Sequence, residues 1–136
     1  MSNEEKRLLL IDLCARLPYD VKMEYCGKAY SIFSRPFKSV IYLTNGADQV
    51  STSLSKCKPY LRPMSSMTTE EEYEYHQCKN INYLDICEME HEEMLKTAAL
   101  CFSRATDWLN KKGFDYRGLI PMGLALEAPQ DMYKTG

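Results

Sequence analysis

The sequence predicts one α+β domain, a small antiparallel β-meander of three or four strands packed against an N-terminal helix and a long C-terminal helix. Its 136 residues are a usual length for a single hydrophobic core. Between residues 21 and 54, β-branched and aromatic residues alternate with polar ones, and turn residues recur at short intervals, which is typical of a meander. Before and after that stretch, apolar residues recur every three or four positions, which indicates helices. We therefore expect residues 1–136 to fold as one unit.

The first helix is predicted from Asn3 to Arg16. Ser2 and Glu5 have the spacing of a capping box, and Pro18 stops the helical pattern. We expect this helix to lie on the sheet through its apolar side. That side consists of Leu8, Leu9, Ile11 and Leu13, with Cys14 alongside.

Two hairpins are predicted in the meander. The segments VKMEY and KAYSIF flank a turn at Cys26–Gly27, and Arg35–Pro36 is expected to end the second of these strands. SVIYLT is the most hydrophobic strand, and the turn signal Asn45–Gly46 leads back into a strand from about Gln49 to Leu54. One face of this sheet should lie on the core.

A connector and a short helix follow the meander. Pro59 and Pro63 predict an extended surface segment rather than a helix or a central strand. Thr68 and Glu71 then repeat the capping-box spacing, which predicts a helix from Thr69 to about Cys78. Residues 80–87 fit either a loop or an edge strand.

The strongest helical pattern runs from about Glu88 to Lys112, with Gly113 at the position of a C-terminal cap. We expect this helix to be the main packing partner of the sheet, with Trp108 in the core. Its apolar stripe consists of Leu95, Ala98, Phe102, Ala105 and Leu109, widened by Met94, Cys101 and Trp108. Glycines and prolines recur in the tail after it, which should pack on the body without a long regular element.

The net charge and the hydropathy of the chain argue against nucleic acid and membranes as general partners. The formal net charge of −2 provides no general attraction to nucleic acid, so DNA binding would need a local basic strip. Such a strip is available in Arg35, Lys38, Lys56, Lys58 and Arg62. Neither a signal peptide nor a membrane-spanning run is present, and we expect a soluble, cytoplasmic protein without a membrane partner.

The sequence predicts no catalytic residues and no cofactor. A nucleophile would need a histidine base and an orienting acid, and no local signature of that kind surrounds His76 or His91. The glycine-rich phosphate loops GxGxxG and GxxxxGK[ST] are also missing. Glutamates cluster only where helices begin, which the helix dipole explains.

One metal site is a possible alternative to this non-catalytic interpretation. His76, Cys78, Cys87 and His91 follow the pattern H-x-C-x8-C-x3-H, and thiolate with imidazole is a donor set that zinc favours. The gap within the first pair is shorter than in usual zinc motifs. The simpler expectation is that all six cysteines are reduced thiols.

The candidate ligand or partner site consists of polar and aromatic residues in irregular backbone. These residues are Tyr60, Arg62, Asp115, Tyr116 and Arg117. The structural alternative is that Arg62 or Arg117 pairs with Asp107 or Asp115, or caps a helix end, and so fixes the tail to the body.

Three segments resemble a family of short uncharacterised proteins of Bacteroides-type gut bacteria and their phages or prophages. They are LLLIDLCARLPYDV from Leu8, KPYLRPMSSMTTEE from Lys58, and DWLNKKGFDYRGLIPMGLALEAP from Asp107. Together they cover more than a third of the chain in the same order as in the family. The resemblance implies a habitat but no activity, and we expect the last two segments to meet in space.

These observations favour a non-enzymatic accessory protein of a phage or mobile element. It would bind a host protein or self-associate, because abundant Tyr and Met make adaptable contact surfaces. One alternative is an anti-defence protein that sequesters a nucleotide signal, with Arg62 and Arg117 on the phosphates and Tyr60 and Tyr116 stacked on the base. A small zinc-dependent protein is the other alternative.

Overall fold

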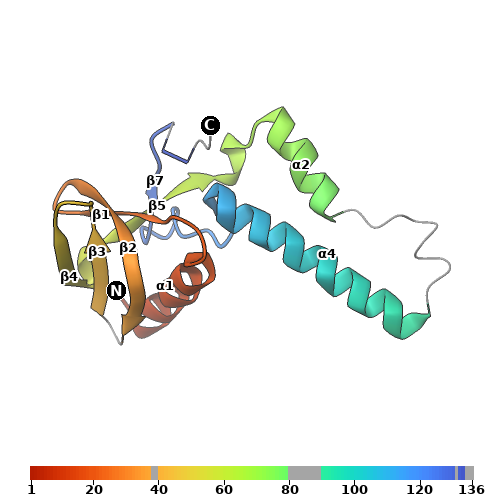
Figure 1. Ribbon diagram of the computed structural model, residues 1–136, viewed down its shortest axis with the longest axis horizontal. Helices are drawn as coiled ribbons and strands as arrows, with labels where there is room; N and C mark the ends of the chain where they lie inside the picture. Colours follow the sequence, from red (N-terminus) through yellow and green to blue (C-terminus); the bar gives the residue numbers. More distant parts are fainter. Residues whose placement is uncertain (38–39, 80–89, 131, 134–136) are drawn as a thin grey trace.

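The computed structural model describes residues 1–37, 40–79, 90–130 and 132–133, of which the side chains of residues 35 and 37 are left out. It has an α+β fold, as predicted, with a compact body and a helical arm that projects from it (Figure 1). The body contains helix α1, the β-meander and the irregular tail, and the arm contains helices α2 and α4. The prediction that residues 80–87 form a loop or an edge strand lies outside the described residues.

Helix α1 spans Asn3–Arg16, as its capping signals predict. The Ser2 hydroxyl accepts a hydrogen bond from the Glu5 backbone N–H, and the Glu5 carboxylate accepts one from the Ser2 N–H. Its buried side differs from the expected one, because Ile11 and Cys14 are exposed. The four residues that α1 buries are Leu9, Asp12, Leu13 and Arg16.

The two predicted hairpins are present. Strand β1 (Lys22–Tyr25) turns through Cys26 and Gly27, both at positive φ, into β2 (Lys28–Phe37). This two-residue turn has the positive φ pair that matches the twist of a hairpin. Strand β3 (Val40–Thr44) then pairs in full register with β4 (Gln49–Ser53). The Asn45 side chain closes the loop between them by accepting hydrogen bonds from the Ala47 and Asp48 N–H groups.

Strand β2 does not end at Arg35–Pro36, so that prediction is wrong. The strand continues to Phe37, and its register against β3 shifts between Ile32 and Ser34 and again between Ser34 and Phe37. Such irregularities allow a proline in a strand, because the ladder needs no N–H at the displaced position. Strand β2 therefore continues past Pro36, although proline usually ends a strand.

The connector is also a strand, contrary to the prediction. Strand β5 (Lys58–Pro63) lies between β1 and β6 in the sheet order β4-β3-β2-β1-β5-β6, and β7 also pairs with it. Pro59 and Pro63 stand near its two ends, so the N–H groups that the sheet needs lie between them. The Arg62 N–H donates to the Gly113 carbonyl at 2.7 Å. The 3-10 turns η1 (Leu54–Lys56) and η2 (Met64–Ser66) bracket this strand.

The hydrophobic core lies between α1 and one face of the sheet. Leu9 and Leu13 from α1 pack with fully buried residues of the central strands, such as Met23, Ile41 and Leu61. The tail completes this core, as expected, with Leu119, Leu124 and Ala125. The only strands described in the tail are the two-residue β6 (Phe114–Asp115) and β7 (Leu126–Glu127).

The arm departs most from the expectation. Helix α2 spans Thr69–Lys79, and α4 spans His91–Lys112 and ends at Gly113 with φ of 79°. Figure 1 shows α4 extending away from the body, with α2 beside the part nearer the body. The core cluster under the sheet contains no residue of α4, and Leu95 and Phe102 of the expected stripe are exposed. In the described part of the chain, α1 rather than α4 therefore covers the sheet.

Candidate functional site

Arg62 joins the body to the arm. Its guanidinium, on β5, forms a two-pronged ion pair with Glu71 of α2, in which Nη1 and Nη2 each donate to a carboxylate oxygen at 2.7 Å. Glu71 also caps α2 by accepting from the Thr68 N–H at 3.0 Å. The Arg62 hydrogen bonds hold the pKa of Glu71 at about 2, well below its ordinary value. The fork of Arg62 is thus occupied by its own chain.

An aromatic ladder continues from Arg62 into the arm; we use this name for Arg62, Phe114, Trp108 and Tyr75. The Arg62 guanidinium lies 4.1 Å from the centre of the Phe114 ring, which is stacked on Trp108 at 5.7 Å. Trp108 in turn contacts Tyr75 of α2 at 5.6 Å between ring centres. Trp108 is half-buried rather than a core residue, and its indole N–H donates to Glu74 at 3.2 Å.

Arg117 belongs to a second, buried cluster around Asp12. The Asp12 carboxylate is fully buried and accepts from Arg16 Nε at 2.8 Å and from Arg117 Nη1 at 2.7 Å. Arg16 also donates to the Phe114 carbonyl at 2.6 Å. Tyr116 has a guanidinium over its ring from Arg16 and another from Arg117. We call Asp12, Arg16, Arg117 and Tyr116 the buried ionic cluster.

The other predicted site residues also hold the tail. Asp115 is buried, and its two carboxylate oxygens accept from the backbone N–H groups of Leu119 and Ile120 at 2.8 and 2.9 Å. The backbone carbonyl of Tyr60 accepts from the Tyr133 hydroxyl at 2.5 Å. Burial raises the pKa of Tyr133 to about 12, so this hydroxyl remains a donor at neutral pH.

The structure thus brings the five candidate residues into one region through the parallel pairing of β5 with β6, where Arg62 is opposite Phe114. As expected, the two resembling segments that contain them meet in space. Arg62 lines the groove at the base of the arm, and the other four do not. Both arginines make internal ion pairs, but Arg62 pairs with Glu71 and Arg117 with Asp12, and only the Arg117 pair fixes the tail to the body.

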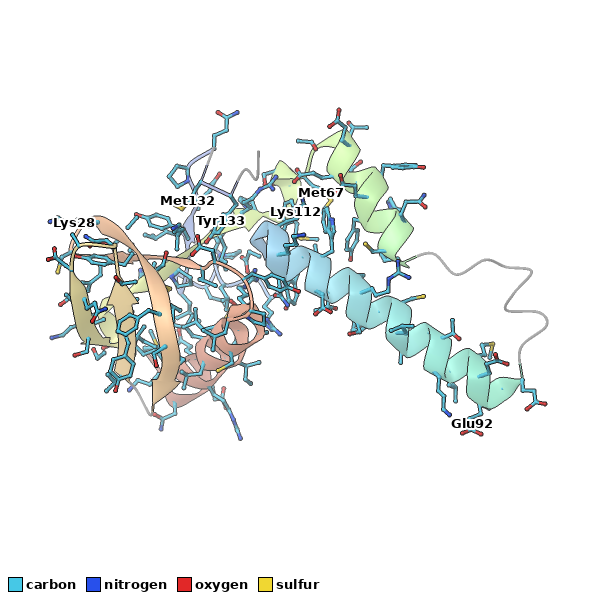
Figure 2. All side chains as sticks on the ribbon, viewed as in Figure 1. Lys28, Met67, Glu92, Lys112, Met132 and Tyr133 are labelled. Atoms are coloured by element: carbon cyan, nitrogen blue, oxygen red, sulfur yellow. The ribbon has the colours of Figure 1, made fainter. Side chains whose placement is uncertain are left out.

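A groove of about 680 Å³ lies where the arm meets the body. Figure 2 shows Lys112 and Tyr133 of its lining at this junction, whereas Glu92 marks the far end of α4. Glutamates outnumber cations among the charged side chains of the lining, which disfavours a phosphate ligand. These charged residues are Arg62, Lys112, Glu70, Glu71, Glu74 and Glu127.

The metal hypothesis remains a prediction. His76 and Cys78 lie in the last turns of α2 and His91 begins α4, while Cys87 lies outside the described residues. Residues 1–37, 40–79, 90–130 and 132–133 contain no group of three or more His, Cys, Asp or Glu that could hold a metal ion.

The cysteines that the structure describes are free thiols, in agreement with the prediction. Cys57 is the most buried of them, and burial raises its pKa to about 11. It therefore stays protonated at neutral pH and packs as a small apolar residue.

An exposed apolar stripe on α4 is the main surface feature that sequence reasoning misplaced. Leu95 is 56% exposed and Phe102 is 77% exposed, although both were expected to pack on the sheet. The same helix buries Cys101, Ala105 and Leu109 on the neighbouring side, which faces α2 and the body. We call Leu95, Ala98, Ala99 and Phe102 the outer stripe.

Sequence reasoning also missed the residues that neutralise the two arginines. Asp12 and Arg16 are four positions apart and in phase with Leu9 and Leu13, so an ion pair on the buried side of α1 was detectable. No local signal could assign Glu71 to Arg62, because the spacing from Thr68 already accounts for Glu71 as the acid of a capping box.

The described part of the chain contains no helix that is both long and apolar enough to span a membrane. Comparison with protein-family models, curated proteins and solved structures finds no match for this chain. The resemblance to the Bacteroides-type family accordingly stays a prediction.

Proposed function

We propose that this protein is a non-enzymatic, cytoplasmic accessory protein of a phage or mobile element that binds another protein chain through the α2–α4 arm. The observation that carries the proposal is the outer stripe, which places Leu95 and Phe102 in solvent on a helix that extends beyond the body. Large apolar side chains grouped on one side of a projecting helix are typical of a protein-binding surface.

The construction of the arm base supports this proposal. Arg62, Glu71 and the aromatic ladder connect the arm to the sheet through side chains that already have partners within the chain. A rigid base reduces the ordering cost when the helix is bound, and so favours recognition by a preformed surface. The arm is therefore suited to present the outer stripe rather than to enclose a small ligand.

The nucleotide alternative has less support. Arg62 and Arg117, which would hold the phosphates, are paired with Glu71 and Asp12. The Tyr116 hydroxyl donates to Asn110 at 2.8 Å, and its ring contacts the guanidinium groups of Arg16 and Arg117. Binding a nucleotide would require these internal contacts to break first.

Affinity capture from a lysate of a Bacteroides-type host tests the proposed function. The tagged protein should retain a protein partner that the variant Leu95→Ser/Phe102→Ser does not retain. The matched control is Leu100→Ser, which changes an equally apolar side chain of α4 that is 60% exposed but lies away from the outer stripe. Capture of the same partner in equal amounts by the wild type and the double variant would refute a role for the arm.

A further inference from the structure

We infer that the partner of the outer stripe is a second copy of this chain, whose α4 lies antiparallel to the first. This inference rests on the proposed function, because it names the chain that the same arm binds. It depends on the spacing of large and small residues along α4, on the charges that flank the stripe, and on the area that the stripe offers.

The outer stripe has the spacing of a helix–helix contact. Leu95, Ala99 and Phe102 of the outer stripe and Thr106 beyond it follow one another at intervals of four, three and four residues, so they share one side of α4. In an antiparallel pair centred between Ala99 and Phe102, the phenyl ring of one chain lies over the small Ala99 of the other. Alternation of large and small residues lets two such helices interlock with themselves.

The flanking charges favour the antiparallel orientation. Lys96 and Asp107 are eleven positions apart, about three turns, and are exposed on the same flank of the outer stripe. An antiparallel copy brings Lys96 of each chain beside Asp107 of the other, which forms the same ion pair twice. In a parallel copy this flank would face the opposite flank of the other helix, so Lys96 and Asp107 would not form this pair of contacts.

The helix ends agree with this orientation. The first turn of α4 carries Glu92 and Glu93, and its last turn carries Lys111 and Lys112. An antiparallel copy brings the acidic first turn of one helix to the level of the basic last turn of the other and opposes the two helix dipoles. The opposite charges at the two ends of α4 therefore favour the antiparallel orientation.

The size of the stripe indicates a reversible dimer. The outer stripe, extended by Thr106, covers about 16 Å of helix at 1.5 Å per residue. Two such stripes bury less than the roughly 1,200 Å² that is usual for a stable specific interface. We therefore expect monomer and dimer to exchange with concentration rather than a permanent dimer.

Sedimentation equilibrium of the purified full chain, from micromolar to near-millimolar concentration, tests the inference. The mass of the wild type should rise from one chain towards two. Phe102→Ser should raise the dimer dissociation constant more than tenfold, because each dimer loses two phenyl contacts. Leu100→Ser is the matched control and should follow the wild type, since position 100 lies about 140° around the helix from Leu95.

A charge exchange tests the orientation. Asp107→Lys should weaken the dimer about fivefold, because two attractive pairs become repulsive. Adding Lys96→Glu to this variant should restore the wild-type dissociation constant. In a parallel dimer Asp107 would not lie beside Lys96 of the other chain, so an unchanged dissociation constant for Asp107→Lys would overturn the antiparallel arrangement.

Two further outcomes separate this inference from the proposed function. A wild type that keeps the mass of one chain at every concentration, or equal behaviour of Phe102→Ser and Leu100→Ser, would overturn self-pairing. If the wild type stays monomeric and the affinity capture still finds a partner that Leu95→Ser/Phe102→Ser loses, the proposed function stands. If neither a dimer nor a captured partner is found, both proposals fail.

Discussion

The body and the arm use the same kinds of side chain in opposite ways. In the body, even charged groups are buried, since Asp12 and Arg16 have almost no exposed surface and neutralise each other. In the arm, even large apolar groups are exposed, as Phe102 shows. The body is therefore organised around its own interior, whereas the arm leaves contact surface for another molecule. Substitutions at matched positions can test this difference.

The largest effect is expected at the centre of the buried ionic cluster. Asp12→Asn should lower the free energy of unfolding by about 3–5 kcal/mol, because Arg16 and Arg117 would lose their carboxylate partner. Urea denaturation at pH 7 measures this loss. The control is Asp20→Asn, whose carboxylate pairs with Lys22 at the surface and should contribute less than about 1 kcal/mol. Equal losses for the two variants would contradict a structural role for the cluster.

A smaller effect is expected at the connection between body and arm. Glu71→Gln should lower the free energy of unfolding by about 2 kcal/mol, because the charge-assisted bonds to Arg62 are lost while glutamine can still cap α2. Thermal unfolding followed by circular dichroism measures the change. Glu72→Gln in the same helical turn is the control, since Glu72 is exposed, and a similar loss there would remove the special role of Glu71.

The same ion pair predicts how stability depends on acid. The folded pKa of Glu71 is about 2 and its ordinary value is 4.5, so the folded state favours the charged carboxylate. Its contribution is therefore complete above pH 4.5 and is lost progressively as the pH falls towards 2. Urea denaturation at several pH values should show a shallower acid dependence for Glu71→Gln than for the wild type. Identical slopes would mean that Arg62 does not stabilise the charged form.

The smallest effect is expected on the outer stripe. Phe102→Ala should change the free energy of unfolding of the dilute protein by less than about 0.5 kcal/mol, because its side chain is 77% exposed. Leu109→Ala in the same helix should cost about 2–5 kcal/mol, because Leu109 is 4% exposed. A large loss for Phe102→Ala in dilute solution would show that the stripe serves the fold of the single chain.

Local signals in the sequence predicted most element boundaries of this fold. The Ser2 capping box, the Cys26–Gly27 turn and Gly113 each depend only on a few adjacent residues. All three begin or end a helix or strand where expected. Strand β5 could not be predicted in this way. Its neighbours β6 and β7 come from the far end of the chain, and its prolines argue against a strand when considered alone.

In the candidate site, too, local features could be predicted from the sequence and long-range partners could not. The sequence pointed to Arg62 and Arg117 as candidate ligand contacts, and in the structure both make internal ion pairs. Their partners depend on how α1 and α2 meet the tail, which no local pattern states. The apolar period of α4 was also identified correctly, but periodicity does not tell a stripe that packs inside the chain from one that faces solvent.

The position of β5 also determines when the protein can fold during synthesis. Both β6 and β7 pair with it in parallel, and they belong to the last quarter of the chain, as do the core residues Leu119 and Leu124. A ribosome that has made the meander and α1 has therefore produced a sheet that still lacks these neighbours and part of its core. The body can close only after residues 114–127 have left the exit tunnel, so the nascent chain carries exposed apolar surface until then.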